Sequence, residues 1–208
     1  MRIESLVESR RPGGKLRIVF ENGSSLTVLP QIAAEFGLCA GDEIDDARLA
    51  EIRRRNAERS AKERAVRIIS TTGVTKRELE RRLVQKGESE EDAKTAVEWL
   101  DDLDLLDDLE IARQTVQRGV AKGYGAARIK QMLYEKQVPR RYWDEALVNL
   151  PPMDDALDAF LQKKLNGSTD RDDLQKAAQA AARRGFSWSE IRAALSRYLE
   201  ETELTMDS

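Results

Sequence analysis

A nine-residue stretch occurs three times in this chain with the same apolar spacing. It is LERRLVQKG at residues 79–87, IKQMLYEKQ at residues 129–137 and AAQAAARRG at residues 177–185, and the copies end 50 and 48 residues apart. The apolar residues eight and four positions before the final residue share one face of a helix. Glycine as the final residue favours the left-handed turn that ends a helix, and Gln137 departs from this rule. The stretch therefore predicts a recurring helix and stop.

A second helix is expected directly after each stop. Ser89 with Asp92, and Ser187 with Glu190, have the spacing of a capping box, and Pro139 suits a first helical turn. Nine residues after the final residue of the stretch, each copy has an alanine on the expected buried face: Ala96, Ala146 and Ala194.

Another helical run precedes each copy, at residues 61–70, 109–118 and 154–165. Each repeat is thus expected to contain three helices. One such unit buries only a thin core, so neighbouring repeats should pack in a row. We predict a mostly α protein with three tandem three-helix repeats in an elongated array, at residues 61–108, 109–151 and 152–201.

Residues 1–45 have a different pattern. Residues 15–20 and 26–29 are rich in β-forming residues, and Asn22-Gly23 between them suits a hairpin turn. Residues 3–7 could add a third strand. We predict a small β-rich N-terminal region, followed by a linking helix at 46–60 that starts near Asp45 or Asp46; residues 202–208 are expected to be a C-terminal tail.

The composition argues against catalysis. The 208 residues include no histidine and one cysteine, Cys39. This removes the commonest general base and leaves too few ligands for a structural zinc site. We expect no enzyme activity and no cofactor or metal; a carboxylate-dependent enzyme at Asp101–Asp108 is the least favoured alternative. Without a signal peptide or a membrane-spanning apolar run, we expect a cytoplasmic protein with no membrane contact.

Charge is unevenly distributed along the chain. The net charge is −3, yet residues 53–67 contain seven bases and two acids, a local charge of +5. Residues 101–110 contain six acids and no base. The asymmetry suggests a polar partner surface, although solvated helix faces would give the same pattern.

Bases also recur beside the repeated stretch. The residue before each final position is basic: Lys86, Lys136 and Arg184. These cations could complement helix C-termini, or they could form a regular row that meets a periodic partner. The tryptophans Trp99, Trp143 and Trp188 are expected in the core or between repeats, whereas Tyr124 on a predicted loop is a better contact candidate.

Short motifs recur in a fixed order through the middle of the chain. They are Arg77-Glu78-Leu79, Leu83, Lys86-Gly87, Leu105-Leu106-Asp107-Asp108, Ile111-Ala112, Val116, Arg118, Gly123-Tyr124-Gly125, Arg128-Ile129, Leu133, Lys136 and Ala146-Leu147. This ordered set resembles the RecX family, bacterial regulators of the RecA recombinase. Three residues depart from the pattern expected of that family: Asp104 and Gln137 stand in place of glycine, and Ile111 stands in place of an aromatic residue.

The resemblance implies a protein that binds RecA filaments on single-stranded DNA and inhibits recombinase, ATPase and co-protease activities. We expect a monomer that could also bind single- or double-stranded DNA. The rival hypothesis is a helical DNA-binding module that acts without RecA, with residues 53–67 on phosphates. The predicted contacts to RecA or to DNA phosphates are Arg77, Arg81, Arg82, Lys86, Arg113, Arg118, Lys122, Tyr124, Arg128, Lys136 and Arg184.

Overall fold

The computed structural model describes residues 1–8 and 14–206. The chain forms two compact units. The first comprises Met1–Gly73 and Leu79–Leu105, and the second comprises Val74–Glu78 and Leu106–Ser208. The beginning of helix α3 (Lys76–Gln85) therefore belongs to the second unit.

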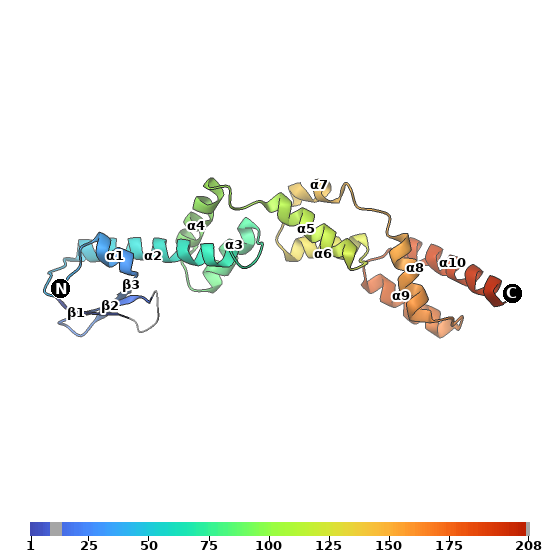
Figure 1. Cartoon of the computed structure of the whole chain (residues 1–208), viewed down its shortest axis with the longest axis horizontal. Coiled ribbons are helices and arrows are strands. Elements are labelled where there is room, and N and C mark those ends of the chain that lie inside the picture. Colours follow the sequence, from blue (N-terminus) through green and yellow to red (C-terminus); the bar gives the residue numbers. More distant parts are fainter. Residues whose placement is uncertain (9–13, 207–208) are drawn as a thin grey trace. The chain divides into compact units, whose positions relative to one another are not determined.

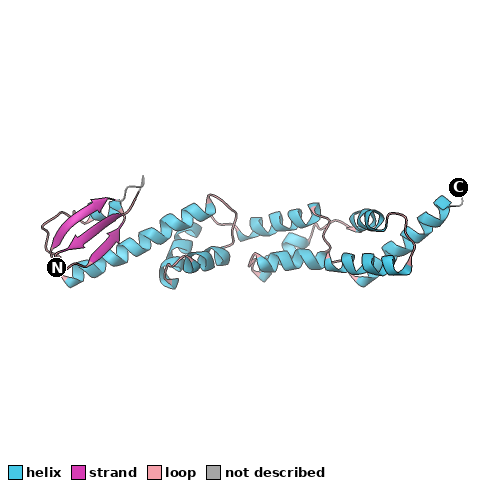
Figure 2. Ribbon diagram, turned by 90° about the horizontal axis from the view of Figure 1, so that it is seen from below, coloured by secondary structure: helices cyan, strands magenta, loops and turns pink. Residues whose placement is uncertain are grey.

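A three-stranded antiparallel sheet opens the first unit, in the order β1 (Ile3–Glu8), β2 (Leu16–Phe20) and β3 (Ser25–Val28) (Figure 2). The hairpin between β2 and β3 turns at Asn22-Gly23, as predicted. Gly23 has a φ of 80° and donates its N–H to the Phe20 carbonyl at 2.9 Å. The predicted third strand is also confirmed, as β1.

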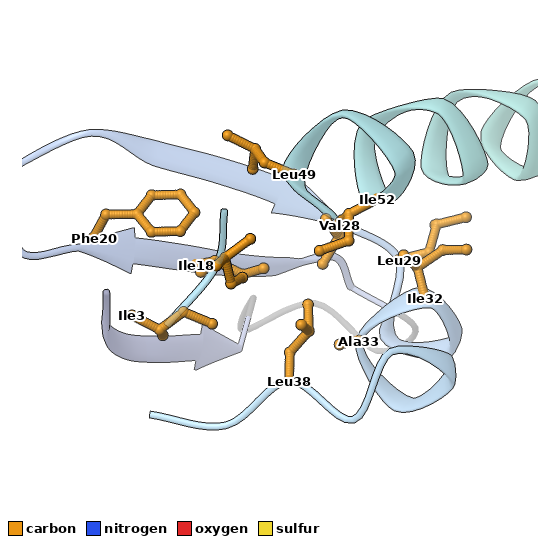
Figure 3. Close-up of a cluster of buried hydrophobic side chains, with 11 residues drawn as sticks. Ile3, Ile18, Phe20, Val28, Leu29, Ile32, Ala33, Leu38, Leu49 and Ile52 are labelled. Atoms are coloured by element: carbon orange, nitrogen blue, oxygen red, sulfur yellow. The ribbon is translucent and has the colours of Figure 1, made fainter. Parts of the chain in front are cut away.

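The core of this unit lies between the sheet, α1 (Pro30–Glu35) and the first part of α2 (Asp46–Ile69) (Figure 3). Leu49 and Ile52 of α2 are buried against it. The side chain of Asn56 also binds the outer edge of β3. It accepts from the Leu29 N–H at 2.8 Å and donates to the Thr27 carbonyl at 3.3 Å. One amide thus occupies backbone groups that an added strand would otherwise bind.

Helix α2 runs without a break through residue 60, where the sequence analysis places a boundary between a linking helix and a repeat. It begins at Asp46, directly after Asp45, whose side chain accepts from the Arg48 N–H at 2.7 Å and caps the helix. Its middle part has little apolar surface but is bridged by ion pairs of Glu58 with Lys62 at 2.7 Å and Arg55 at 3.9 Å. Such pairs at helical spacing support an exposed helix.

Three successive groups of three helices follow, as predicted (Figure 1). The last part of α2 packs with α4 (Glu90–Asp102), and α3 lies between them in sequence. In the second unit, α5 (Asp108–Ala121) and α6 (Ala126–Glu135) pack with a short third member. It comprises a 3-10 turn, η1 (Arg140–Tyr142), and α7 (Trp143–Leu147). The last group is α8 (Asp154–Leu165), α9 (Arg171–Arg183) and α10 (Trp188–Met206).

The predicted apolar faces are buried. Leu79, Leu83, Ile129 and Leu133 are fully inside, and the small Ala177 and Ala181 take the same positions in the last group. Helix α10 continues to Met206, although the sequence analysis places a tail from residue 202. Residues 207–208 lie outside the described residues.

The predicted helix stops keep one backbone conformation in all three copies. Gly87 and Gly185 have φ angles of 93° and 91°, and Gln137 has a φ of 55°. Asp104, which stands where the family pattern expects glycine, also has a positive φ of 53°. The left-handed turn is therefore kept at Gln137 and Asp104, where glycine is absent. A residue with a Cβ is strained in this conformation.

The predicted helix caps are also present. Ser89 accepts from the Asp92 N–H at 3.0 Å. Ser187 and Glu190 cap each other reciprocally, with the Ser187 N–H donating to the Glu190 carboxylate at 2.6 Å. These contacts fix where the final helix begins in the first and last groups, whereas the middle group has no side-chain cap there.

Candidate functional site

Two of the recurring turns pack on the starts of other helices within the second unit. The Gly125 N–H donates to the Arg184 carbonyl at 2.9 Å. The Thr75 hydroxyl donates to the Lys136 carbonyl at 2.9 Å. Gly125 follows Thr75 by 50 residues, the offset that also separates the first two copies of the stretch. The same repeat positions therefore meet in both contacts, once through a backbone N–H and once through a hydroxyl.

The contact at Gly125 depends on bare backbone. A Cβ on Gly125 would overlap the Gly185 carbonyl, and a Cβ on Gly185 would overlap the Arg128 backbone. The Ala127 N–H adds a hydrogen bond to the Gly185 carbonyl at 3.2 Å. In the sequence Gly125 stands out only as part of the family motif, because residue spacing does not reveal which backbones come close.

The contact at Thr75 depends on polar side chains. The Lys136 ammonium lies 3.5 Å from the Glu78 carboxylate, which is 5% exposed. The buried Asp108 accepts from the Lys76 N–H at 2.8 Å and so caps a helix other than its own. Its neighbour Asp107 caps α5 itself and accepts from the Glu110 N–H at 2.9 Å.

The three bases of the predicted row have different surroundings. Lys86 is exposed, whereas Lys136 is half-buried beside Glu78. The guanidinium of Arg184 lies 4.5 Å from the ring centre of Phe160 and 5.8 Å from that of Tyr124. Both Lys136 and Arg184 thus contribute to contacts inside the second unit.

Helix α3 presents its predicted bases to solvent. Arg77 and Arg81 are exposed, and Arg82 is half-buried. The exposed bases are Arg77, Arg81 and Lys86, which follow one another at intervals of four and five residues; Lys86 lies just after the helix. Leu79 and Leu83 point into the core, as predicted, so they hold this face outward.

The remaining predicted bases lie on α5, α6 and the turn between them. Arg113 pairs with Glu145 at 2.7 Å, and Arg128 pairs with Glu135 at 3.1 Å. Arg118 donates to the Gln114 carbonyl at 3.2 Å, and Lys122 is exposed. A small pocket of about 250 Å3 brings two predicted residues together; it is lined by Glu78, Thr115, Arg118, Met132, Glu135 and Lys136.

A larger groove of about 650 Å3 lies on the first unit and contains none of the predicted contacts. Arg55 donates to Glu35 at 2.9 Å there, and the hydrogen bond from Lys62 holds the pKa of Glu58 below its ordinary value. The other bases of the lining belong to the basic run that the sequence analysis noted. The groove is lined by Ile32, Glu35, Arg55, Glu58, Arg59, Lys62, Glu63, Val66, Arg67 and Trp99.

The tryptophans differ in burial. Trp143 is buried, as predicted, and its indole N–H donates to the Val138 carbonyl at 3.0 Å. The prediction of a position in the core or between repeats is wrong for Trp188, which is 59% exposed at the start of α10. The reason is that Phe186, two residues earlier, fills the core instead. Tyr124 is half-buried against the core of α5 and α6.

Within residues 1–8 and 14–206, acidic and cysteine side chains form no cluster of three that could hold a metal ion. Over the same part of the chain, every helix is too short or too polar to cross a bilayer.

Two of the three-helix groups match domains of a known protein family. Residues 107–147 match the second three-helix domain of RecX, and residues 153–195 match the third. The chain is 32% identical over 145 residues to the regulatory protein RecX of Vibrio campbellii, which covers 66% of this chain and 90% of that protein. It is 24% identical over 207 residues to the regulatory protein RecX of Clostridioides difficile, with 97% of each chain covered.

Solved structures share the fold. A crystal structure of a regulatory protein RecX covers 94% of this chain and 98% of its own, with a TM-score of 0.65 and 21% identity. RecX from Lactobacillus salivarius covers 72% of this chain and 99% of its own, with a TM-score of 0.60 and 21% identity.

Proposed function

Because the chain belongs to the RecX family of regulatory proteins, we propose that it binds RecA filaments on single-stranded DNA and inhibits their recombinase, ATPase and co-protease activities. It acts by binding and not by catalysis, in the control of DNA repair and recombination. The contact residues we propose are the eleven predicted from the sequence, and the exposed bases of α3 and of the turn after it are the ones we propose to test first.

One observation carries this choice of surface. Arg77, Arg81 and Lys86 are exposed along one helix and its following turn. Exposed guanidinium groups can bind carboxylates in a bidentate manner, and several on one rigid helix give a defined geometry. Lys136 and Arg184 have a second role in this proposal, since their carbonyls also hold the packing of the second unit.

The positive charge of this surface should mainly raise the rate at which the protein associates with its partner. Exposed charges steer encounter with an oppositely charged partner and lose strength as salt screens them. Inhibition of RecA should therefore weaken as ionic strength rises.

The test is RecA ATPase on single-stranded DNA, measured with increasing amounts of this protein at low and high salt. We expect inhibition that needs more protein at high salt. An unchanged ATPase rate, together with no binding of the protein to RecA–DNA filaments, would refute the proposed function.

A second candidate is DNA binding without RecA, favoured by the exposed Arg53, Arg59 and Arg67 of α2. Binding of an oligonucleotide by the isolated protein should then weaken steeply with salt, because bound phosphates release counterions. Tight binding to bare DNA combined with no effect on RecA would favour this alternative.

A further inference from the structure

The groove on the first unit combines an apolar floor with two exposed bases. Val66 is 41% exposed there, and Trp99 also lines the groove, with the Lys62 ammonium 5.5 Å from its ring centre. Arg55 and Lys62 bind Glu35 and Glu58, whereas Arg59 and Arg67 are exposed. The latter two are eight residues apart on α2, which corresponds to about 12 Å along the helix.

The same unit carries a turn of complementary chemistry. After α4 the chain turns at Asp104, whose N–H donates to the Asp101 carbonyl at 2.9 Å. The next N–H, of Leu105, donates to the Leu100 carbonyl at 3.0 Å, so the turn is held in place. Leu103 and Leu105 are 51% and 54% exposed, which is unusual for leucines beside exposed carboxylates.

We propose that the acidic turn of one copy of this chain occupies the α2 groove of a second copy. Leu103 and Leu105 cover Val66 and Trp99, while the carboxylates of Asp102 and Asp104 pair with Arg59 and Arg67. A fixed turn loses little conformational entropy when it binds. The proposal revises the expected monomer and does not rest on the proposed regulation of RecA.

The groove and the turn lie on the same unit, so two copies can exchange the contact in both directions. Trp99 of the groove stands four residues before Leu103 of the turn, at the end of the same helix. Each copy therefore has both halves close together, and two copies can form the contact twice about a two-fold axis. In the proposed arrangement the two copies form a closed dimer and not an open chain.

The groove fits such a segment better than a nucleic acid strand. Glu63 lies four residues from both Arg59 and Arg67, and it lines the groove with Glu35 and Glu58. A strand carries one phosphate per nucleotide along its whole length and would bring several anions against these three carboxylates, whereas the turn brings only two. A peptide turn with two acids and two leucines matches both the exposed bases and the apolar side chains of the groove.

The test is sedimentation velocity of the full chain over a wide concentration range at low and high salt. We expect a monomer–dimer equilibrium that weakens with salt. Arg59→Glu with Arg67→Glu should raise the dissociation constant at least about tenfold, and Leu103→Ser with Leu105→Ser should do the same. Circular dichroism checks that both variants keep the helical fold, and Arg171→Glu with Arg192→Glu is the control that should dimerise normally.

Mixing the two defective variants gives the decisive result. The Arg59→Glu/Arg67→Glu variant retains an intact turn, and the Leu103→Ser/Leu105→Ser variant retains an intact groove. Their mixture should therefore form a dimer through a single contact, although neither variant dimerises alone. A wild type that stays monomeric at every concentration, or variants that dimerise as well as wild type, would overturn the proposal. So would a monomeric protein whose groove variant loses binding to a thymidine oligonucleotide, since the groove would then be a nucleic acid site.

Discussion

The two turn contacts inside the second unit occupy the same place in the repeat and use different chemistry. At Gly125 and Gly185, two backbones approach so closely that neither position has room for a Cβ. At Thr75 and Gln137, both positions carry side chains, and the Thr75 hydroxyl provides the hydrogen bond. The difference teaches that a repeat can keep its packing position while replacing backbone contact by side-chain contact.

The largest expected effect comes from closing the space at the glycine contact. Gly125→Ala should lower the free energy of unfolding by about 2–3 kcal/mol, because the new methyl group overpacks against the Gly185 carbonyl. Gly125 has an ordinary φ of −70°, so the loss reports the contact and not backbone strain. Urea denaturation followed by circular dichroism measures it.

Gly167→Ala is the matched control for this prediction. Gly167 has a φ of 86°, but a Cβ there would meet no atom within 4 Å. Its substitution should cost only the left-handed conformation, about 1–2 kcal/mol. If Gly125→Ala costs less than this control, the backbone approach is not what holds the contact.

A smaller effect is expected at the polar contact. Thr75→Val keeps the shape of a fully buried side chain but removes the donor to the Lys136 carbonyl and the acceptor for the Glu78 N–H. The free energy of unfolding should fall by about 1–2 kcal/mol. Thr75→Ser retains the hydroxyl and should recover most of this loss; a serine variant as unstable as the valine variant would show that the methyl group matters as much as the hydroxyl.

The smallest effect should come from relieving the strained stop. Gln137→Gly allows the positive φ of 55° without a Cβ, but glycine also gains freedom in the unfolded chain. The two terms oppose each other, so we expect stabilisation of at most about 0.5 kcal/mol. Gln137→Ala provides the comparison, because it keeps the strain. A glycine variant less stable than the alanine variant would mean that the strain is not significant.

Local features of this fold are readable from the sequence because each depends on neighbours in the chain. The hairpin at Asn22-Gly23, the capping box at Ser187 and the left-handed stop at Gly185 all follow from spacing of a few residues. Even Gln137 adopts the conformation that its repeat position requires. Buried faces such as that of Leu79 and Leu83 follow from helical periodicity for the same reason.

Contacts between distant segments were not readable in this way. Asp108 belongs to an acidic run in the sequence, and nothing in its spacing indicates that it caps the helix that begins after Thr75. Trp188 is predicted in the core or between repeats, but it is exposed and Phe186 fills the core. The predicted partner residues remain predictions, because the exposure of Arg77 and Arg81 shows only that a partner can reach these side chains.

The role of the α3 surface is the central claim, and RecA ATPase on single-stranded DNA tests it most directly. The variant reverses charge at Arg77, Arg81 and Lys86 together. A control variant reverses Arg171, Lys176 and Arg192, which are exposed bases of the last repeat outside the proposed surface. Both should melt like wild type, because reversal of exposed charges usually changes stability little.

We predict that the α3 variant needs at least about tenfold more protein than wild type for the same inhibition at low salt, because like charges then face each other across the contact. The control should inhibit as wild type does, and the difference should narrow as salt rises. An α3 variant that melts normally and inhibits RecA at the wild-type concentration in low salt would contradict the account.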